Sequence, residues 1–239
     1  MLKPRLIRIL PLLATAILCA VGISLGNWQT RRAEEKETIA KVMQEQLRQA
    51  PVLLNKAQDF SQLQTFQKVK LTGSFDHTWP LYLDNRPLKG VAGFYVLMPF
   101  KIQGSDQYVL VARGWLQRNP AERTKIPRLL TAQGVIEIEG VVRERLDRTM
   151  QLGKSENLKP GVIVQSVPIQ ELRQQTGFAI FDKVLEQTSN AGDGLVRDWP
   201  KPSDGSDKHR AYAFQWYGLA LMAAIFFVVT GIRRGKNRE

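Results

Sequence analysis

Cysteine and histidine are scarce in this chain, which has one cysteine and two histidines among its 239 residues. A single cysteine cannot form an intramolecular disulfide, so the folded state must rest on core packing. So few His and Cys side chains also exclude a zinc or copper site built from several of them. The one cysteine, Cys19, lies inside an apolar run near the amino terminus.

The chain also lacks the motifs that commonly mark catalytic sites. It has no Walker loop, no G-x-G-x-x-G segment after a strand and no G-x-S-x-G elbow. Ser74, Asp76 and His77 are near neighbours, but adjacent side chains of a strand point to opposite faces, which argues against a catalytic triad. We therefore expect a protein that is not an enzyme.

A basic run interleaved with aromatic residues is missing too, although the formal net charge is +12. The positive charge is densest at the two ends, in residues 3–8 and 233–238, and is dispersed elsewhere. This distribution does not indicate nucleic acid as a partner. It is typical of the cytoplasmic flanks of membrane spans, so we expect both termini to be cytoplasmic.

Two long uncharged runs lie next to these basic ends, and their lengths are close to the roughly 20 residues that cross a bilayer. The sequence predicts a cytoplasmic segment 1–8, a transmembrane helix 9–25, an extracytoplasmic domain 26–211, a second transmembrane helix 212–232 and a cytoplasmic segment 233–239. A cleavable signal peptide is the alternative for the first run, because a basic segment followed by an apolar one is common to both.

Between the two spans, the spacing of the apolar residues changes from the period of a helix to that of a strand. Residues 28–50 are rich in Arg, Glu, Lys, Gln and Ala, which predicts a juxtamembrane helix. Alternating or short apolar runs then predict strands over 69–75, 93–102, 108–116, 136–142, 161–167 and 178–185, with a short helix over 169–175. The expected fold class is membrane-anchored α+β. Two transmembrane helices flank a mostly antiparallel β domain whose sheet is barrel-like or highly curved.

One histidine, His209, lies at the expected outer end of the second span. If the helix begins by Lys208, then His209, Tyr212 and Trp216 share a face through their spacing of three and four. Aromatic and polar residues at 28–32 are expected at the same depth on the first helix. An imidazole there can ligate haem iron, with aromatic rings against the macrocycle and Arg near its propionates. The alternative is an interfacial histidine that hydrogen-bonds water or a backbone group.

Four sequence blocks carry a family resemblance. The first, L-G-N-W-Q-T-R-R-A-E-E-K, follows the first span, and the second, V-K-L-T-G-S-F-D-H, opens the sheet. The third leads from N-R-P-L-K-G-V-A-G-F-Y-V-L-M-P-F into V-L-V-A-R-G-W-L-Q-R-N-P, and the fourth is D-K-H-R-A-Y-A-F-Q-W-Y. Together they resemble the Surfeit locus family of membrane proteins that assist cytochrome c oxidase assembly. The chain departs from that family at Ala112, where an Asn is usual, and over 143–177, where a Trp-containing segment is missing.

The resemblance implies a role in assembly rather than a reaction. The implied function is to aid biogenesis of the haem-bearing core subunit of cytochrome c oxidase, with transient binding of haem a as one route. The implied partners are the lipid bilayer, that core subunit and, as one option, haem a synthase. A haem-independent membrane scaffold that holds oxidase subunits is the alternative.

The family also implies a site and a location. The histidine of its H-x-x-Y-A block is implicated in haem binding and corresponds here to His209, which would ligate the haem iron. With no Arg- and Ser-rich transit peptide before the first span, we expect a bacterial inner-membrane protein with a periplasmic central domain. The expected site residues are His209, Tyr212, Gln215 and Trp216 on the second helix and Trp28, Gln29 and Arg31 on the first.

Overall fold

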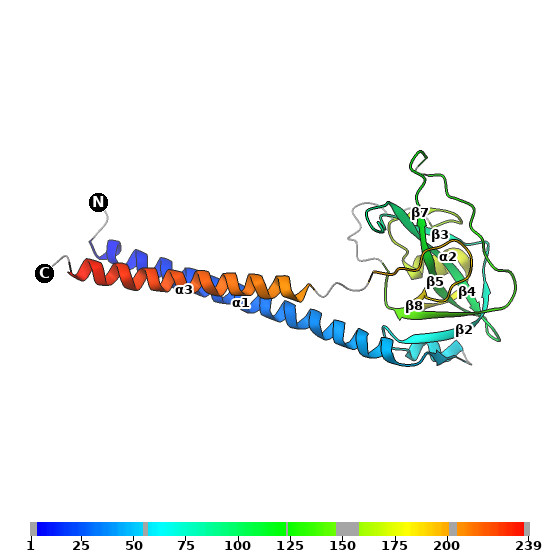
Figure 1. Cartoon of the computed structure of the whole chain (residues 1–239), viewed down its shortest axis with the longest axis horizontal. Coiled ribbons are helices and arrows are strands. Elements are labelled where there is room, and N and C mark those ends of the chain that lie inside the picture. Colours follow the sequence, from blue (N-terminus) through cyan, green and yellow to red (C-terminus); the bar gives the residue numbers. More distant parts are fainter. Residues whose placement is uncertain (1–3, 55–56, 123, 147–157, 201–204, 237–239) are drawn as a thin grey trace. The chain divides into compact units, whose positions relative to one another are not determined.

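The computed structural model describes residues 4–54, 57–122, 124–146, 158–200 and 205–236. The chain divides into two compact units. The first, Met1–Val42 with Pro202–Glu239, contains two long helices and is called the helical unit. The second, Met43–Lys201, contains the sheet and is called the barrel unit. Figure 1 shows both units and labels most of their helices and strands.

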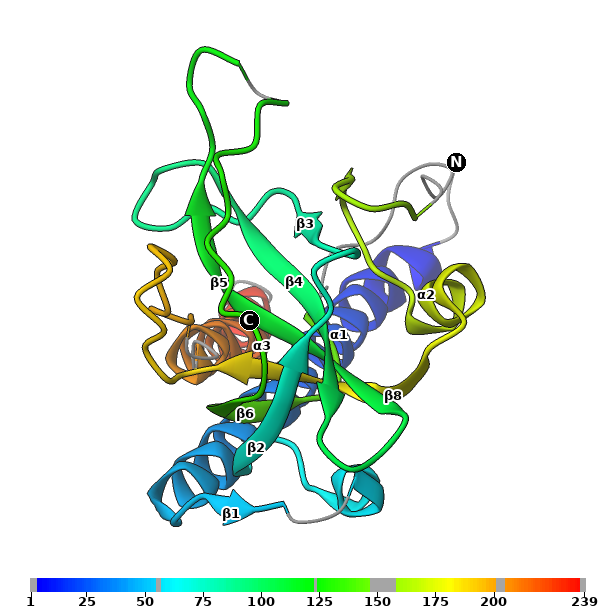
Figure 2. The ribbon, with the colours of Figure 1, turned by 90° about the vertical axis from the view of Figure 1, so that its right-hand side faces the viewer.

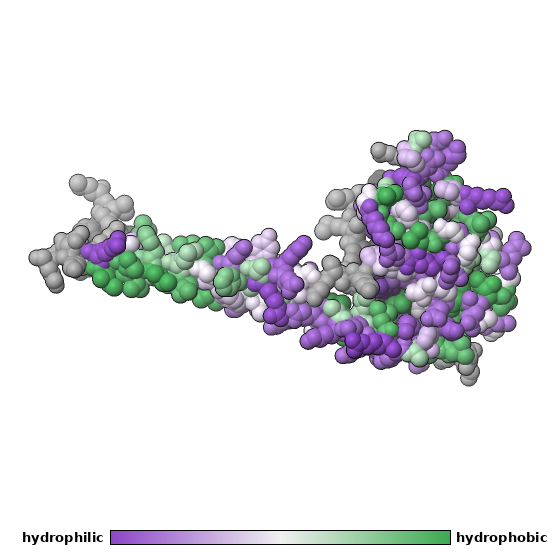
Figure 3. Space-filling view, viewed as in Figure 1, coloured by the Kyte–Doolittle hydropathy of each residue, from purple (hydrophilic) through white to green (hydrophobic). Residues whose placement is uncertain are grey.

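The helical unit consists of α1 (Pro4–Arg48), whose last turns belong to the barrel unit, and α3 (Ser206–Lys236). Ile9–Arg48 and Ser206–Arg233 are each long and apolar enough to cross a membrane. In the apolar stretch of each helix, only 11% of the residues are buried. Figure 3 shows apolar residues covering much of the visible face of these two helices. Such a surface suits lipid rather than water, so the predicted membrane-anchored fold is confirmed.

Small residues let α1 and α3 approach closely. A Cβ atom added at Gly22 would lie 3.0 Å from the Cβ of Ala220, and one added at Gly26 would overlap the ring of Tyr217. The thiol of Cys19 donates a hydrogen bond to the carbonyl oxygen of Ala220 at 3.4 Å. Close backbone approach of this kind is a common basis of helix association in membranes. We call this line of contact the seam.

In the part of the chain that the structure describes, the barrel unit contains eight strands and two short helices. The strands are β1 (Val52–Leu53), β2 (Lys68–Phe75), β3 (Leu81–Leu83), β4 (Gly93–Ile102), β5 (Gln107–Gln117), β6 (Ile136–Arg143), β7 (Ile163–Val164) and β8 (Ala179–Gln187). The helices are the 3₁₀ helix η1 (Ala57–Gln62) and the α-helix α2 (Ile169–Thr176). Strand β2 buries every second residue, as its alternating sequence predicts.

Five strands close into a barrel because β2 pairs with β4 as well as with β6. The ring runs β2–β6–β8–β5–β4 and returns to β2 (Figure 2). Its pairings are antiparallel except for the parallel pair β5–β8. Strands β1, β3 and β7 pair from outside the closed ring. The predicted barrel-like and mostly antiparallel sheet is therefore confirmed.

Some details differ from the sequence prediction. The strand expected over 161–167 is reduced to Ile163–Val164, because the amide of Val162 closes a turn with the carbonyl of Lys159 and Pro168 already caps α2. Strands β1 and β3 were not predicted, since two or three residues are too short to show a period.

The barrel interior holds the largest cluster of buried apolar residues. Phe60 and Leu63 pack against it from the η1 region. Its members on the ring strands are Val69, Leu71, Phe75, Met98, Phe100, Val109, Val111, Ile138, Val142 and Leu185. Residues that alternate with these form a second cluster on the outer face of β4, β5 and β8, together with α2 and β7.

A buried ion pair ties the segment after β8 to the barrel. Arg113 on β5 is only 1% exposed and donates a hydrogen bond to Asp193 at 2.9 Å. Arg197 donates to the same carboxylate oxygen at 2.7 Å. Burial raises the pKa of Asp193, but the hydrogen bond and charge of Arg197, the Leu195 amide and the Arg113 charge outweigh it. The pKa therefore lies below its ordinary 3.8.

Candidate functional site

His209 lies in the first turn of α3 and is half-buried. Its ring atom Nδ1 lies 2.6 Å from the amide oxygen Oε1 of Gln29 on α1. An amide oxygen can only accept a hydrogen bond, so this contact is a hydrogen bond in the tautomer that carries its proton on Nδ1. In the neutral imidazole Nε2 then keeps its lone pair, and this nitrogen is the one left free to ligate a metal.

Helical geometry places Trp216 on the same side of the seam as His209. Residues seven apart in an α-helix lie within about 20° of one another around the axis. Trp216 is half-buried, and its carbonyl oxygen lies 3.0 Å from the position of a Cβ atom added at Gly22. Tyr212, one turn beyond His209, is 53% exposed. We call the side that carries Gln29, His209, Tyr212 and Trp216 the histidine flank.

The structure does not bring the other expected site residues to the His209–Gln29 contact. Trp28 is 46% exposed, and Arg31 and Gln215 are also exposed. Neighbouring residues of a helix are turned by about 100° from one another, so Trp28 cannot point where Gln29 points. The expected site thus divides into a hydrogen-bonded pair, two aromatic residues on its flank and three residues that face outward.

The opposite flank of the seam carries contacts that the sequence analysis missed. Arg210 donates two hydrogen bonds to the carboxylate of Glu37, at 2.8 and 2.9 Å. The hydroxyl of Tyr217 donates to the side-chain oxygen of Asn27 at 2.7 Å. A cavity of about 280 Å³ lies on this flank, lined by Thr30, Ala33, Glu34, Arg210, Ala213, Phe214 and Tyr217. The opposite charges of Glu37 and Arg210 were the available signal, but a single sequence does not show which charged residues meet.

The side chains around His209 limit the kinds of metal that it could bind. Within the described residues, no group of three or more His, Cys, Asp and Glu side chains could hold a metal ion. A metal held at His209 would have to bring most of its other ligands with it, as the iron of a porphyrin does. The aromatic side chains of the histidine flank would then face such a macrocycle.

Two residues of the third sequence block, Arg86 and Trp115, serve packing in the barrel unit. The indole nitrogen of Trp115 donates a hydrogen bond to the carbonyl oxygen of Arg86 at 2.6 Å. The indole ring lies against Gly93, where a Cβ atom would overlap it. This close approach accounts for a glycine at the start of β4.

Known proteins resemble the chain over most of its length. The model of the SURF1 family matches residues 16–221, a range that includes both Gln29 and His209. A SURF1-like protein of Rickettsia felis is 29% identical over 224 residues, which are 91% of this chain and 95% of the relative. A SURF1-like protein of Rickettsia bellii is 28% identical over 221 residues, 90% and 88% of the two chains. The Saccharomyces cerevisiae protein named Cytochrome oxidase assembly protein SHY1 is 30% identical over 98 residues, 40% of this chain and 25% of the yeast protein.

Proposed function

Because this chain belongs to the SURF1 family, we propose that it is an assembly factor for cytochrome c oxidase and not an enzyme. The name of the yeast relative, Cytochrome oxidase assembly protein SHY1, supports this role. In this proposal the chain aids biogenesis of the haem-bearing core subunit and holds haem a for a short time.

The hydrogen bond between His209 and Gln29 carries the haem part of the proposal. It holds Nδ1 of His209 as the donor at 2.6 Å and leaves Nε2 free. A metal-ligating histidine usually donates its other ring N–H to a neighbouring oxygen, which fixes the ring and makes the ligating nitrogen more basic. Gln29 supplies that oxygen before any ligand is bound.

The remaining residues of the histidine flank would receive the macrocycle. His209 would hold the iron through its imidazole, and Trp216 and Tyr212 would offer ring faces to the macrocycle on the same side. We assign no part in holding the iron to Trp28, Arg31 and Gln215, because they face away from the seam. One protein ligand on an open helix face suits a cofactor that is passed on.

The proposed location is a bacterial inner membrane. Two apolar helices and relatives in Rickettsia support it. The basic residues near both ends of the chain support cytoplasmic termini and a periplasmic barrel unit. His209 would then lie at the outer edge of the bilayer, where the oxidase core subunit and haem a synthase are the proposed partners.

A haem-independent scaffold is the second candidate function. It is favoured by exposed apolar side chains on the barrel unit, with Leu130 57% and Val135 59% exposed. Such residues could contact oxidase subunits without any part of the histidine flank.

Oxidase activity in cells that lack the native chain separates the two candidates. We expect the wild-type chain to restore activity and His209→Ala to fail although it reaches the membrane in equal amount. His77→Ala is the matched control, because His77 is the other histidine and is exposed in the barrel unit. Full activity with His209→Ala, together with loss of its bound haem, would favour the scaffold.

A further inference from the structure

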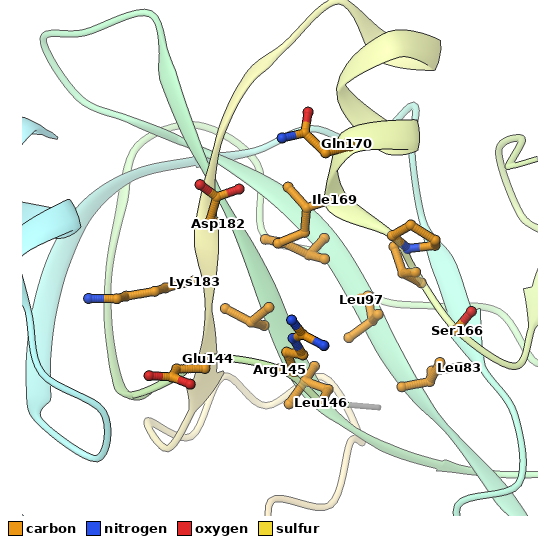
Figure 4. A pocket seen from close by; sticks show the side chains of 14 residues that line it. Leu83, Leu97, Glu144, Arg145, Leu146, Ser166, Ile169, Gln170, Asp182 and Lys183 are labelled. Carbon is orange, nitrogen blue, oxygen red and sulfur yellow. The ribbon is translucent and has the colours of Figure 1, made fainter. Parts of the chain in front are cut away.

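A cavity in the barrel unit lies outside the closed ring, against strands β3, β4, β5 and β8. Its volume is about 700 Å³, within the range of small-molecule sites. The floor comes from four neighbouring strands and consists of Leu83, Leu97, Leu110 and Val184. The walls are the start of α2, with the residues just before it, and residues 144–146 (Figure 4).

The floor and walls favour an aliphatic ligand over a peptide. At the floor residues, strands β3, β4, β5 and β8 are paired on both sides, so the backbone groups there are bonded within the sheet. A peptide laid on them would find no sheet edge for its own amide groups, and a buried amide without a partner is costly. The apolar lining residues are aliphatic, without an aromatic ring or a His, Cys or Met ligand, so the cavity does not suit haem.

Three of the four charged side chains that line the cavity have partners among the described residues. Glu144 accepts a hydrogen bond from Thr65 at 3.2 Å, and Asp182 pairs with Arg173 at 2.9 Å. Lys183 donates to the carbonyl oxygens of residues 61 and 63. Within the described residues, Arg145 is the charged lining side chain without such a partner.

Figure 4 shows how these side chains lie. The guanidinium of Arg145 is near the middle of the view, between Leu97 and Leu146. The charged ends of Glu144 and Lys183 point to the side, away from Leu97. The cavity therefore presents an aliphatic surface with one available cation.

We propose that this cavity binds an aliphatic chain that ends in a single anionic group, with the chain on the leucine floor and the anion on Arg145. A carboxylate or a phosphate accepts two parallel hydrogen bonds from a guanidinium, so the head group has a geometric partner. The site is independent of the proposed haem site, because the two share no residue.

Photolabelling of the full-length chain in nanodiscs of zwitterionic phospholipid tests the proposal. The probe is dodecanoate with a diazirine at its methyl end, and labelled residues are mapped by mass spectrometry. We expect label on cavity residues, reduced about tenfold by Arg145→Gln, since a charge-assisted hydrogen bond contributes about that factor. Ile169→Trp, which fills the cavity and keeps Arg145, should also reduce the label. Arg128→Gln is the matched control, because Arg128 is exposed and does not line the cavity.

Competition identifies the head group. Unlabelled dodecanoate or dodecyl phosphate should displace the probe, and the stronger of the two assigns the anion as carboxylate or phosphate. Displacement by dodecanol as strong as that by dodecanoate would overturn the proposal. So would label confined to the helical unit, or label on the cavity that Arg145→Gln leaves unchanged.

Discussion

His209 and Gln29 are 180 positions apart in the sequence, yet the imidazole Nδ1 of one lies 2.6 Å from the amide oxygen of the other. The contact joins the first turn of α3 to the middle of α1 and favours the tautomer in which Nε2 of His209 is free. The proposed haem ligation depends on it, because a ring nitrogen that carries the proton cannot bind iron.

Removing the amide of Gln29 tests its positioning role. Gln29→Leu leaves His209 in place but without an acceptor for Nδ1, so haem affinity should fall by about 10- to 100-fold. Titration of haem into the purified chain, followed by absorbance, measures the affinity. Gln44→Leu is the control, because Gln44 is exposed on the same helix. Equal affinity of the Gln29 variant and the wild type would show that this hydrogen bond has no influence on the site.

Adding a methyl group at Gly26 tests the seam. The new Cβ atom would overlap the ring of Tyr217, which must move and release the Asn27 side chain. Gly26→Ala should therefore loosen the helix pair and expose Cys19, whose thiol is hydrogen-bonded to Ala220. The readout is the rate at which maleimide alkylates Cys19, the single cysteine of the chain, in detergent.

We expect the alkylation rate to rise severalfold in Gly26→Ala. It should stay at the wild-type value in Gly218→Ala, because a Cβ atom added at Gly218 meets nothing within 4 Å. An equal rise in both variants would mean that helix packing at Gly26 does not protect the thiol.

The buried carboxylate of Asp193 is predicted to stabilise the barrel unit. Asp193→Asn leaves Arg113 with its charge buried and uncompensated, which should cost about 3–5 kcal/mol of unfolding free energy. Urea unfolding followed by tryptophan fluorescence measures this loss. Asp106→Asn removes a fully exposed partner of Lys101 and should leave the unfolding midpoint unchanged. Equal midpoints for the two variants would contradict the structural role of Asp193.

The lowered pKa of Asp193 predicts that the stability of the barrel unit depends on pH. The folded-state pKa of Asp193 lies below its ordinary 3.8, so its contribution is complete above that value and is lost as pH falls through the folded pKa. Unfolding midpoints measured from pH 6 down to pH 2 should fall less steeply in Asp193→Asn than in the wild type. Parallel curves for the two chains would contradict the lowered pKa.

Much of the fold was predictable because its signals are local. The strand expected over 93–102 coincides with β4, and the helix expected over 169–175 with α2, since each has an apolar pattern bounded by turn residues or proline. The parallel pairing of β5 with β8 was not predictable. It is a contact between distant segments, and strand patterns do not show which strands are neighbours.

The sequence predicted at which level of the two helices the candidate site lies, but not which residues turn toward the seam. Counting from the two spans placed Gln29 and His209 at the same level, and the structure places them in contact. The count of residues did not show that Trp28 and Arg31 turn away from the seam, because the rotation of a helix about its axis is set by packing. Here that packing is the fit of Gly22 and Gly26 against α3. The pair of Arg210 with Glu37 was missed for the same reason.

The absorption spectrum of the full-length chain, purified from cells that make haem a, tests the central claim most directly. The account predicts a haem band in the wild type and in His77→Ala, its loss in His209→Ala, and no band from cells without haem a synthesis. A His209→Ala chain that keeps the full haem content of the wild type would contradict it.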